Sequence, residues 1–391
     1  MSAEIIGPLV LGAYANGGRC VVRHEGRVVF VRLGLPGETV LARVDDDSHA
    51  GYWFATCVEV LEASPHRVTP ACPVAATCGG CDFQHAALEY QRELKAQAVS
   101  DQLAKVGCAL SEPLVALPLR KDEIGFGWRT RMDYTCRDGK MGLTGTRSHR
   151  MVPLPADGCL IAHPDGRAAA SALAKRGARG AANWRVVVSS ESEVRVADER
   201  DKTAMREPVH EWVGRRQFAV QTGGFWQVHP SAAGTFTDVV LEYLEPKSGE
   251  KAIDLYCGVG LFAGALVDAG CDVTGVEGDK GAVALAKRNV PQARFVAAEL
   301  PTKVPLAQLS ADVDLVVLDP PRAGAKGMVA AIVGVHPRAI AYVSCDPATL
   351  ARDLADFATC GYAVTEARVF DAFPMTHHVE TLVKLVPNAR S

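Results

Sequence analysis

The stretch that decides the fold is KAIDLYCGVGLFAGALVDAG, residues 251–270. KAIDLY has the apolar character of a buried strand, CGVG supplies a glycine turn, and LFAGALVDAG is typical of an apolar helix. The same order follows at once, with CDVTGVEG as a second strand and GAVALAKRNV as a second helix. VDLVVLDPP and RAIAYVSCDP predict later strands with helices between them. This alternation predicts an α/β fold with a parallel, doubly wound, Rossmann-like sheet over residues 241–391.

The residues before this sheet predict two further domains. Residues 1–65 contain short strands separated by glycine turns, which predicts a small β-barrel of the OB-like kind. Residues 66–240 predict a mixed α+β central domain, with a helix from about Ala87 to Val106 and an Ala-rich helix near 165–180. The simpler interpretation of the barrel is a structural cap.

Charge and composition limit the possible functions. The 391 residues carry 42 basic and 45 acidic side chains, which excludes a uniformly basic nucleic-acid binder. Residues 111–240 hold 19 Lys and Arg against 15 Asp and Glu, whereas residues 241–391 hold 14 against 18. This asymmetry is compatible with one segment that contacts a polyanion and another that holds a small cofactor. Without an apolar run of 18 residues or a signal-like start, the sequence predicts a cytoplasmic protein that does not contact a membrane.

The glycine loop predicts a cofactor site. Gly258 and Gly260 would let the backbone approach a ligand at the end of the strand, and Glu277 ends the next strand, where a carboxylate suits ribose hydroxyls. The loop alone does not separate NAD from S-adenosylmethionine. Asp254 before the glycines and the Asp319-Pro-Pro-Arg322 segment favour S-adenosylmethionine.

A cysteine and a carboxylate near the C-terminal strands suggest covalent catalysis. Cys345 follows a predicted strand, at the edge where doubly wound sheets place their sites, and Glu380 precedes the last apolar strand. A thiolate that adds to carbon 6 of uracil makes carbon 5 nucleophilic, and a carboxylate can then remove the surplus proton from carbon 5. The simpler interpretations are a buried inert cysteine and a surface glutamate.

Several segments together resemble the RNA uracil-C5 methyltransferases. They are Phe225-Trp-Gln227, Asp254–Gly260, Asp319-Pro-Pro-Arg322, Ser344-Cys-Asp-Pro347 and His378-Val-Glu-Thr381. The resemblance implies that Cys345 is the nucleophile and Glu380 the base. It also implies a pocket for the methyl donor and the target base, formed by Gln227, Asp254, Tyr256, Gly258, Gly260, Glu277 and Asp319.

The N-terminal half resembles one branch of this family. Residues 1–65 look like the RNA-binding TRAM barrel, and Cys72, Cys78, Cys81 and Cys159 look like the iron–sulfur site of the ribosomal-RNA branch. The resemblance therefore implies a 4Fe-4S cluster, although four thiolates also suit zinc. It favours 23S rRNA as the substrate, with tRNA as the alternative, and a monomer without an obligate protein partner.

Two residues depart from the family pattern, and two other functions stay open. Leu261 stands where relatives commonly have Asn, and His229 replaces an Asn that often follows the Gln of the first motif. The alternatives are a non-catalytic RNA-binding protein and an oxidoreductase that uses NAD and an iron–sulfur cluster.

A basic, aromatic stretch at 126–150 predicts RNA contacts. Arg129 and Arg131 would share one face of a strand, and Trp128 and Tyr134 lie between basic residues. Basic groups contact phosphates and aromatic rings stack on unpaired bases. The simpler interpretation is a solvated hairpin whose aromatic side chains belong to the core.

Overall fold

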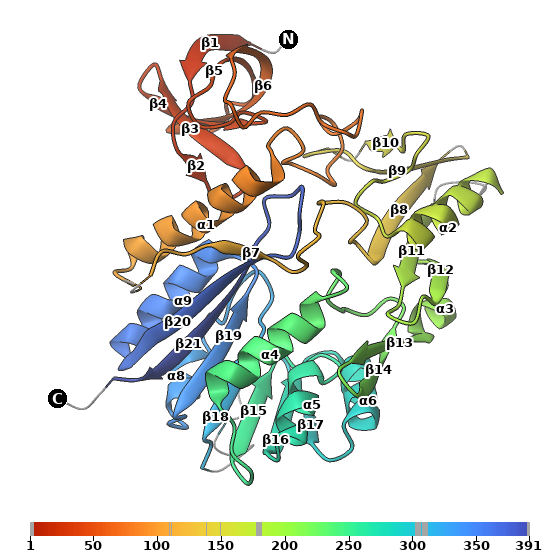
Figure 1. Ribbon diagram of the computed structural model, residues 1–391, viewed down its shortest axis with the longest axis vertical. Helices are drawn as coiled ribbons and strands as arrows, with labels where there is room; N and C mark the ends of the chain where they lie inside the picture. Colours follow the sequence, from red (N-terminus) through yellow and green to blue (C-terminus); the bar gives the residue numbers. More distant parts are fainter. Residues whose placement is uncertain are drawn as a thin grey trace.

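An eight-stranded sheet occupies the C-terminal half of the molecule (Figure 1). The computed structural model describes residues 4–108, 110, 112–137, 139–148, 150–176, 182–301, 306 and 312–388. In spatial order the strands are β17 (Arg294–Ala297), β16 (Asp272–Glu277), β15 (Lys251–Leu255), β18 (Leu315–Leu318), β19 (Ala339–Ser344), β21 (Glu380–Pro387), β20 (Tyr362–Asp371) and β7 (Ala116–Pro118). Only β21 runs antiparallel to its two neighbours among these strands. The predicted doubly wound α/β sheet is confirmed.

Alternate residues of these strands pack against opposite layers of helices, as the period of two requires. Leu315 and Val317 pack in one core with helices α4 (Ala232–Leu244), α5 (Leu261–Asp268) and α6 (Lys280–Asn289). Val316 and Leu318 pack in the other core with α1 (Leu88–Lys105), α8 (Val329–Val333) and α9 (Pro347–Thr359). Both faces are covered, which is why the strands are apolar almost throughout.

The N-terminal sheet has six strands and its own core. In spatial order they are β1 (Ile5–Val10), β5 (Thr39–Asp46), β6 (Tyr52–Glu62), β4 (Arg27–Arg32), β3 (Arg19–His24) and β2 (Tyr14–Ala15). Val29, Val31 and Val40 point inward and are fully buried. Just after β1, the N–H of Gly12 donates to the carbonyl of Val21 in β3 over 3.0 Å, so the sheet curls on itself. This β-rich N-terminal domain agrees with the predicted barrel.

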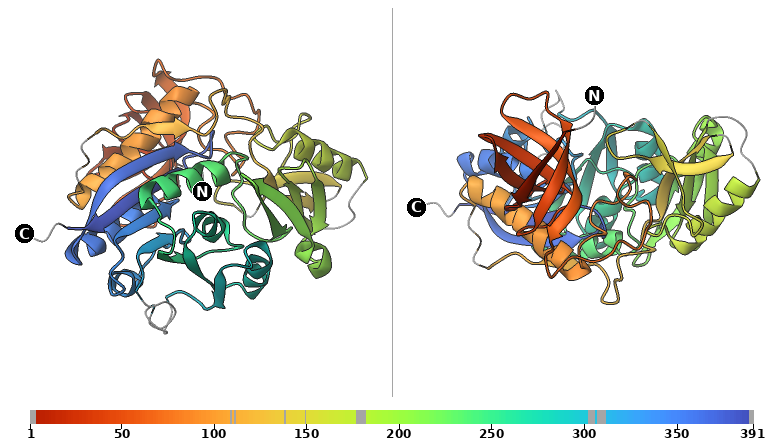
Figure 2. Two further views of the ribbon diagram at one scale, coloured as in Figure 1. Left: turned by 60° about the horizontal axis from the view of Figure 1, so that its bottom comes forward. Right: turned by 90° about the horizontal axis from the view of Figure 1, so that it is seen from above.

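A third, five-stranded sheet lies apart from the barrel, as Figure 2 shows from two directions. Its order is β10 (Met151–Pro153), β9 (Lys140–Thr144), β8 (Arg131–Arg137), β11 (Ala182–Val188) and β12 (Val194–Asp198). Helix α2 (Pro164–Lys175) packs on it, while residues 177–180 of the helix expected near 165–180 lie outside the described residues. A short helix α3 (Lys202–Arg206) and the hairpin β13 (Pro208–Val213) and β14 (Arg216–Gln221) follow.

Parts of the segment 66–240 reach the main sheet. The side chains of Val99 and Leu103 on α1 pack in the core shared with α8 and α9, and β7 is the edge strand beside β20. The division into domains at 65 and 240 stays a prediction. None of the helices in the described ranges combines the length and apolar character needed to cross a membrane.

Candidate active site

The glycine loop is shaped by three residues with positive φ. Tyr256, Gly258 and Gly260 have φ of 62°, 51° and 93°, and the chain thereby turns from β15 into α5. A Cβ on Gly260 would lie 3.2 Å from the ring of Phe295, so this position needs glycine for space as well as conformation. The Glu277 carboxylate accepts from the N–H of Gly258 over 3.1 Å, which ties the loop to the end of β16.

Asp254 lies beneath this loop and not in the cavity. Its Oδ2 accepts from the N–H of Ala263 over 2.9 Å, and its side chain is completely buried. Burial raises the pKa of Asp254 well above its usual range. The structure thus shows Asp254 fastening the start of α5 to the end of β15, and neither Asp254 nor Gly260 lines the cavity. Any contribution of these two residues to donor binding is through the loop.

The other predicted residues meet at one cavity of about 730 Å³, a size typical of ligand sites. It opens at the carboxyl ends of β15, β16, β18 and β19, where a doubly wound sheet binds its ligands. The predicted residues that line it are Gln227, Tyr256, Gly258, Glu277, Asp319, Cys345 and Glu380.

Cys345 and Glu380 are brought together by strand pairing. Ser344, the last residue of β19, pairs with Thr381 of β21. Cys345, which directly follows β19, therefore comes next to Glu380, the first residue of β21. Glu380 is buried, and its Oε2 has no hydrogen-bond partner in the described part of the protein. Burial raises the pKa of Glu380 well above its usual range, and the charge of Asp319 adds to this. Burial, followed by the charges of Glu380 and Asp319, raises the pKa of Cys345 to about 12.

Asp319 and Arg322 complete the polar wall. Burial raises the pKa of Asp319 to about 7, and Gln227 Nε2 donates to its Oδ2 over 3.4 Å. Arg322 donates to His378 Nε2 over 3.2 Å, and its charge lowers the pKa of Cys345 and of Glu380. Burial lowers the pKa of His378 to about 3, so its ring is neutral at pH 7 and can accept this bond. This part of the cavity therefore brings the Asp319 and Glu380 carboxyl groups and the Arg322 guanidinium to the Cys345 thiol.

Phe225, Phe373 and Thr376 line the cavity but were not predicted as site residues. Phe373 and Thr376 lie on the loop before Glu380, and the ring of Phe373 contacts that of His378 edge-on at 6.0 Å. Only the short distance in sequence from Phe373 and Thr376 to the His-Val-Glu-Thr motif could have indicated that they belong to the site. Phe225 also lines the cavity and is 73% exposed, which leaves its ring free to stack on a base.

The two departures from the family pattern have structural explanations. His229 is buried, its Nε2 lies 2.9 Å from Glu123 Oε2, and its Nδ1 accepts from the N–H of Ser231. Leu261 is buried in the core between α5 and the sheet. Neither side chain lines the cavity.

The predicted RNA contacts of the 126–150 stretch need a correction. Arg131 is 5% exposed and pairs with buried Glu211 at 3.3 Å, so it cannot reach a phosphate. Trp128 and Tyr134 are core residues, 1% exposed each. Arg129 differs, because it is half-buried and lines the cavity. The local pattern placed both arginines on a strand face, but Glu211 comes from β13, far along the chain.

The four predicted metal-binding cysteines are all buried around the start of the central sheet. Cys78, Cys81 and Cys159 belong to one core cluster. Burial raises the pKa of the Cys78 thiol, with a further contribution from the charge of Cys72, and Cys159 is influenced by Cys78 in the same way. The N–H of Gly80 donates to Cys78 Sγ over 3.4 Å. Within the described ranges, no group of three or more His, Cys, Asp or Glu side chains is placed to hold a metal ion.

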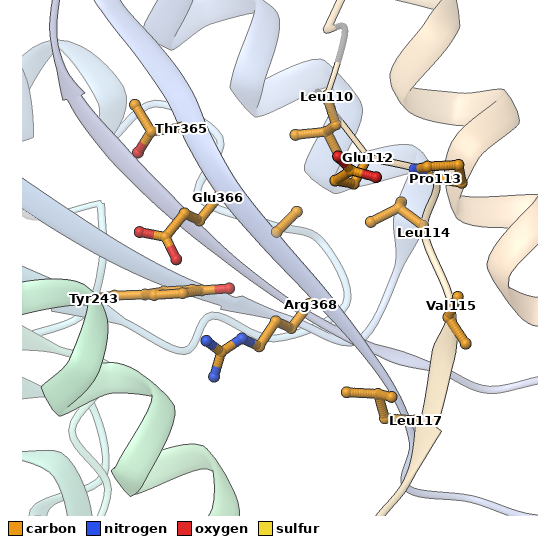
Figure 3. A pocket seen from close by; sticks show the side chains of 11 residues that line it. Leu110, Glu112, Pro113, Leu114, Val115, Leu117, Tyr243, Thr365, Glu366 and Arg368 are labelled. Carbon is orange, nitrogen blue, oxygen red and sulfur yellow. The ribbon is translucent and has the colours of Figure 1, made fainter.

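A second, smaller hollow of about 300 Å³ lies beside β20 and the segment before β7 (Figure 3). It shares no residue with the cavity of Cys345 and contains none of the predicted site residues. Its lining is mainly apolar side chains of 110–117, with Tyr243, Glu366 and Arg368 opposite them.

The fold and the cavity define an S-adenosylmethionine-dependent methyltransferase. A family described as tRNA (Uracil-5-)-methyltransferase matches residues 186–387. A protein of Streptomyces avermitilis described as an uncharacterised RNA methyltransferase is 40% identical, over 97% of this chain and 98% of that protein. The 23S rRNA (uracil(1939)-C(5))-methyltransferase RlmD of Shewanella sp. strain ANA-3 is 30% identical, over 93% of this chain and 92% of that protein.

The chain belongs to the RNA uracil-5-methyltransferase family. Its fold is also that of the tRNA (uracil-54, C5)-methyltransferase of Pyrococcus abyssi, solved in complex with S-adenosyl-L-homocysteine. That structure has a TM-score of 0.74 and 23% sequence identity, and the likeness covers 97% of this chain and all of that one.

Proposed function

We propose that the protein methylates carbon 5 of one uridine in 23S rRNA through a covalent adduct between Cys345 and carbon 6. The observation that carries the mechanism is the facing placement of Cys345 and Glu380 at one cavity. The rRNA preference is supported by the RlmD relatives and by the resemblance of the cysteine pattern to that of the ribosomal branch.

The residues divide the reaction between them. The Cys345 thiolate forms an S–C6 bond, and the electron pair of the C5=C6 double bond moves to carbon 5. S-adenosylmethionine, when bound, supplies the methyl group that carbon 5 takes from its sulfonium. The Glu380 carboxylate then removes the proton from carbon 5, the C5=C6 bond forms again, and the S–C6 bond breaks to release the thiolate.

The surroundings fit these roles. Burial raises the pKa values of both Cys345 and Glu380, so it disfavours the thiolate and the carboxylate before substrate binds. The positive charge of Arg322 favours the ionised form of both groups, so it helps to prepare the thiolate and the base. Glu277, bonded to the glycine loop, and Tyr256 form the opposite side of the cavity, where the methyl donor would lie.

The target uridine must leave its stack to reach Cys345, which costs a few kcal/mol and least where the base is already unpaired. Exposed Phe225 offers a ring for stacking next to the cavity. We therefore expect a target in an RNA loop.

Cys72, Cys78, Cys81 and Cys159 are proposed to hold a 4Fe-4S cluster. The proposal is supported by the burial of all four thiols, by the electrostatic influence of Cys78 on its neighbours and by backbone N–H groups that point at the sulfurs of Cys78 and Cys159. Backbone donors to thiolates are common at such clusters and tune their potential. When bound, the cluster would tie the cysteine loop to α2 and the central sheet.

Substrate mapping tests the proposal. Purified enzyme is incubated with S-adenosylmethionine and with unmodified 23S rRNA or total tRNA, and 5-methyluridine is mapped by mass spectrometry of nuclease fragments. We expect one methylated uridine in 23S rRNA. Methylation confined to tRNA would overturn the rRNA preference, and methylation of neither RNA would overturn the proposed substrate class.

A further inference from the structure

The loop 372–379, between β20 and β21, forms one wall of the cavity and leads directly to Glu380. It contributes Phe373, Thr376 and His378 to the lining. Met375, at its centre, has a φ of 66°, a left-handed conformation that side chains other than glycine rarely adopt. Such a residue persists only where its surroundings hold it, and these conformations concentrate at functional sites.

Gln91 of helix α1 holds this strained residue. Its Oε1 accepts from the N–H of Met375 over 3.0 Å. Its Nε2 donates to the carbonyls of Phe83 and Ala86 over 3.1 and 2.9 Å, and lies 3.3 Å from Met375 Sδ. Gln91 is completely buried, so both ends of its amide are committed to these partners.

Other residues on α1 and just before it hold the rest of the loop 372–379. The N–H groups of Asp82 and Phe83 donate to the carbonyl of Met375, both over 3.0 Å. The Asp82 carboxylate lies 2.6 Å from His377 Nδ1. Lys95, which is also buried, donates to the carbonyl of Phe373 over 3.0 Å. Figure 1 shows the loop leaving the sheet towards the segment between β6 and α1.

We propose that Gln91 is a positioning residue for the methyl-transfer reaction, because it holds Met375 in its left-handed conformation and thereby places His378 and Glu380. The proposal rests on the function proposed above, in which Glu380 removes the proton from carbon 5. The loop runs from Ala372 to Val379, the residue before the base, so a shift at Met375 is transmitted over only a few residues to Glu380. Cys345 lies between β19 and α9, outside this loop, and keeps its place.

This arrangement predicts which step fails when Gln91 is removed. Attack by Cys345 does not need the loop, whereas proton removal needs Glu380 within hydrogen-bond reach of carbon 5. A misplacement of about 1 Å can cost about 100-fold in rate. In Gln91→Leu we therefore expect kcat to fall at least about 10-fold, with the KM for RNA and the affinity for S-adenosyl-L-homocysteine within about threefold of the wild type.

The decisive measurement is the covalent intermediate. Wild type, Gln91→Leu and Gln97→Leu are mixed with substrate RNA and S-adenosylmethionine, and the protein–RNA adduct is followed on denaturing gels. Gln97 lies on the exposed side of the same helix, so its variant is a matched control that should behave like the wild type. We expect the adduct to persist longer in Gln91→Leu alone. Gln91→Glu, which keeps the size of the side chain, is judged by the same criteria should the Leu variant fail to fold.

Testing Gln91→Leu together with Met375→Gly distinguishes a role of Gln91 in positioning the loop from a role in stabilising the fold. With Met375→Gly the left-handed conformation no longer needs to be enforced, so the loss of kcat caused by Gln91→Leu should shrink at least about threefold. An equal loss in both backgrounds, or turnover of Gln91→Leu within threefold of Gln97→Leu, would overturn the proposal. A different result would contradict the proposed function itself. In that case RNA with 5-fluorouridine at the target would form no adduct with the wild type or with Gln97→Leu.

Discussion

Ser344 of β19 and Thr381 of β21 are register partners in an antiparallel pair, and this pairing sets Cys345 opposite Glu380. All other neighbouring strands described in this sheet, apart from β20 and β21, run parallel. The one reversed strand therefore brings its first residue, Glu380, to the same edge of the sheet as Cys345, which directly follows β19. The proposed nucleophile and base meet for this topological reason, although 34 intervening residues separate them in the sequence.

Replacing Cys345 and replacing Glu380 should block different steps of the reaction. Cys345→Ala should abolish both the covalent adduct and methyl transfer, because no other thiol lines the cavity in the described residues. Glu380→Gln should still form the adduct but lower turnover about 100- to 10,000-fold, the usual contribution of a positioned base. Denaturing gels and methyl-group incorporation measure the two steps. Cys360→Ala, which changes an exposed cysteine, is the control, and near-normal turnover in Cys345→Ala would show that the nucleophile is another group.

The thiol of free Cys345 should react faster as the pH rises. Burial and the charges of Glu380 and Asp319 raise its pKa to about 12, so its thiolate fraction grows about tenfold for each unit between pH 7 and pH 9. Alkylation by iodoacetamide, located by peptide mass spectrometry, should follow this slope without a plateau. At a fixed pH near 9, Glu380→Gln removes a nearby negative charge and should alkylate faster, whereas Arg322→Gln removes a positive charge and should alkylate more slowly. A plateau below pH 8 would contradict this account.

The sheet and the pair Cys345 and Glu380 were predicted from the sequence, but the buried contacts of Asp254 and Gln91 were not. Strand, glycine turn and helix at 251–270 follow from local patterns, and these were confirmed. Asp254 looked like a ligand residue because it precedes the glycines, yet its strand position points it under the loop to the N–H of Ala263. The local sequence pattern did not indicate a role for Gln91, because a polar residue on a helix is usually exposed and its partner Met375 is 284 positions away. Contacts of this kind depend on tertiary packing and not on local spacing.

The cysteine site predicts a coloured protein. Enzyme purified without oxygen should contain iron and acid-labile sulfide, and Cys159→Ser should lower both. Cys360→Ser should not, since Cys360 is exposed and lies in the methyltransferase region. Metal analysis with sulfide determination gives the result. A colourless protein with stoichiometric zinc and no sulfide would replace the cluster with a zinc site.

Arg131 should matter for stability and not for RNA contact. Its guanidinium donates to the Glu211 carboxylate, and both side chains are at least nine-tenths buried. Removing one partner of such a pair leaves a buried charge without compensation and costs about 3–5 kcal/mol. Arg131→Ala should therefore unfold at a clearly lower denaturant concentration than the wild type. Arg200→Ala, which breaks an exposed pair with Asp198, should change stability by less than about 1 kcal/mol.

Arg129 should supply the RNA contact that the sequence had assigned to both arginines. Its half-buried side chain lines the cavity, and its Nε donates to the carbonyl of Arg131 over 3.2 Å, which aims the guanidinium along the wall. Arg129→Ala should weaken RNA binding at low salt and reduce the slope of log affinity against log salt by about 1, the value for one lost phosphate contact. Titration of labelled substrate RNA at several salt concentrations measures this slope, and the affinity for S-adenosyl-L-homocysteine should not change. A parallel loss of affinity at every salt concentration would mean that Arg129 contacts a base or shapes the cavity instead of binding phosphate.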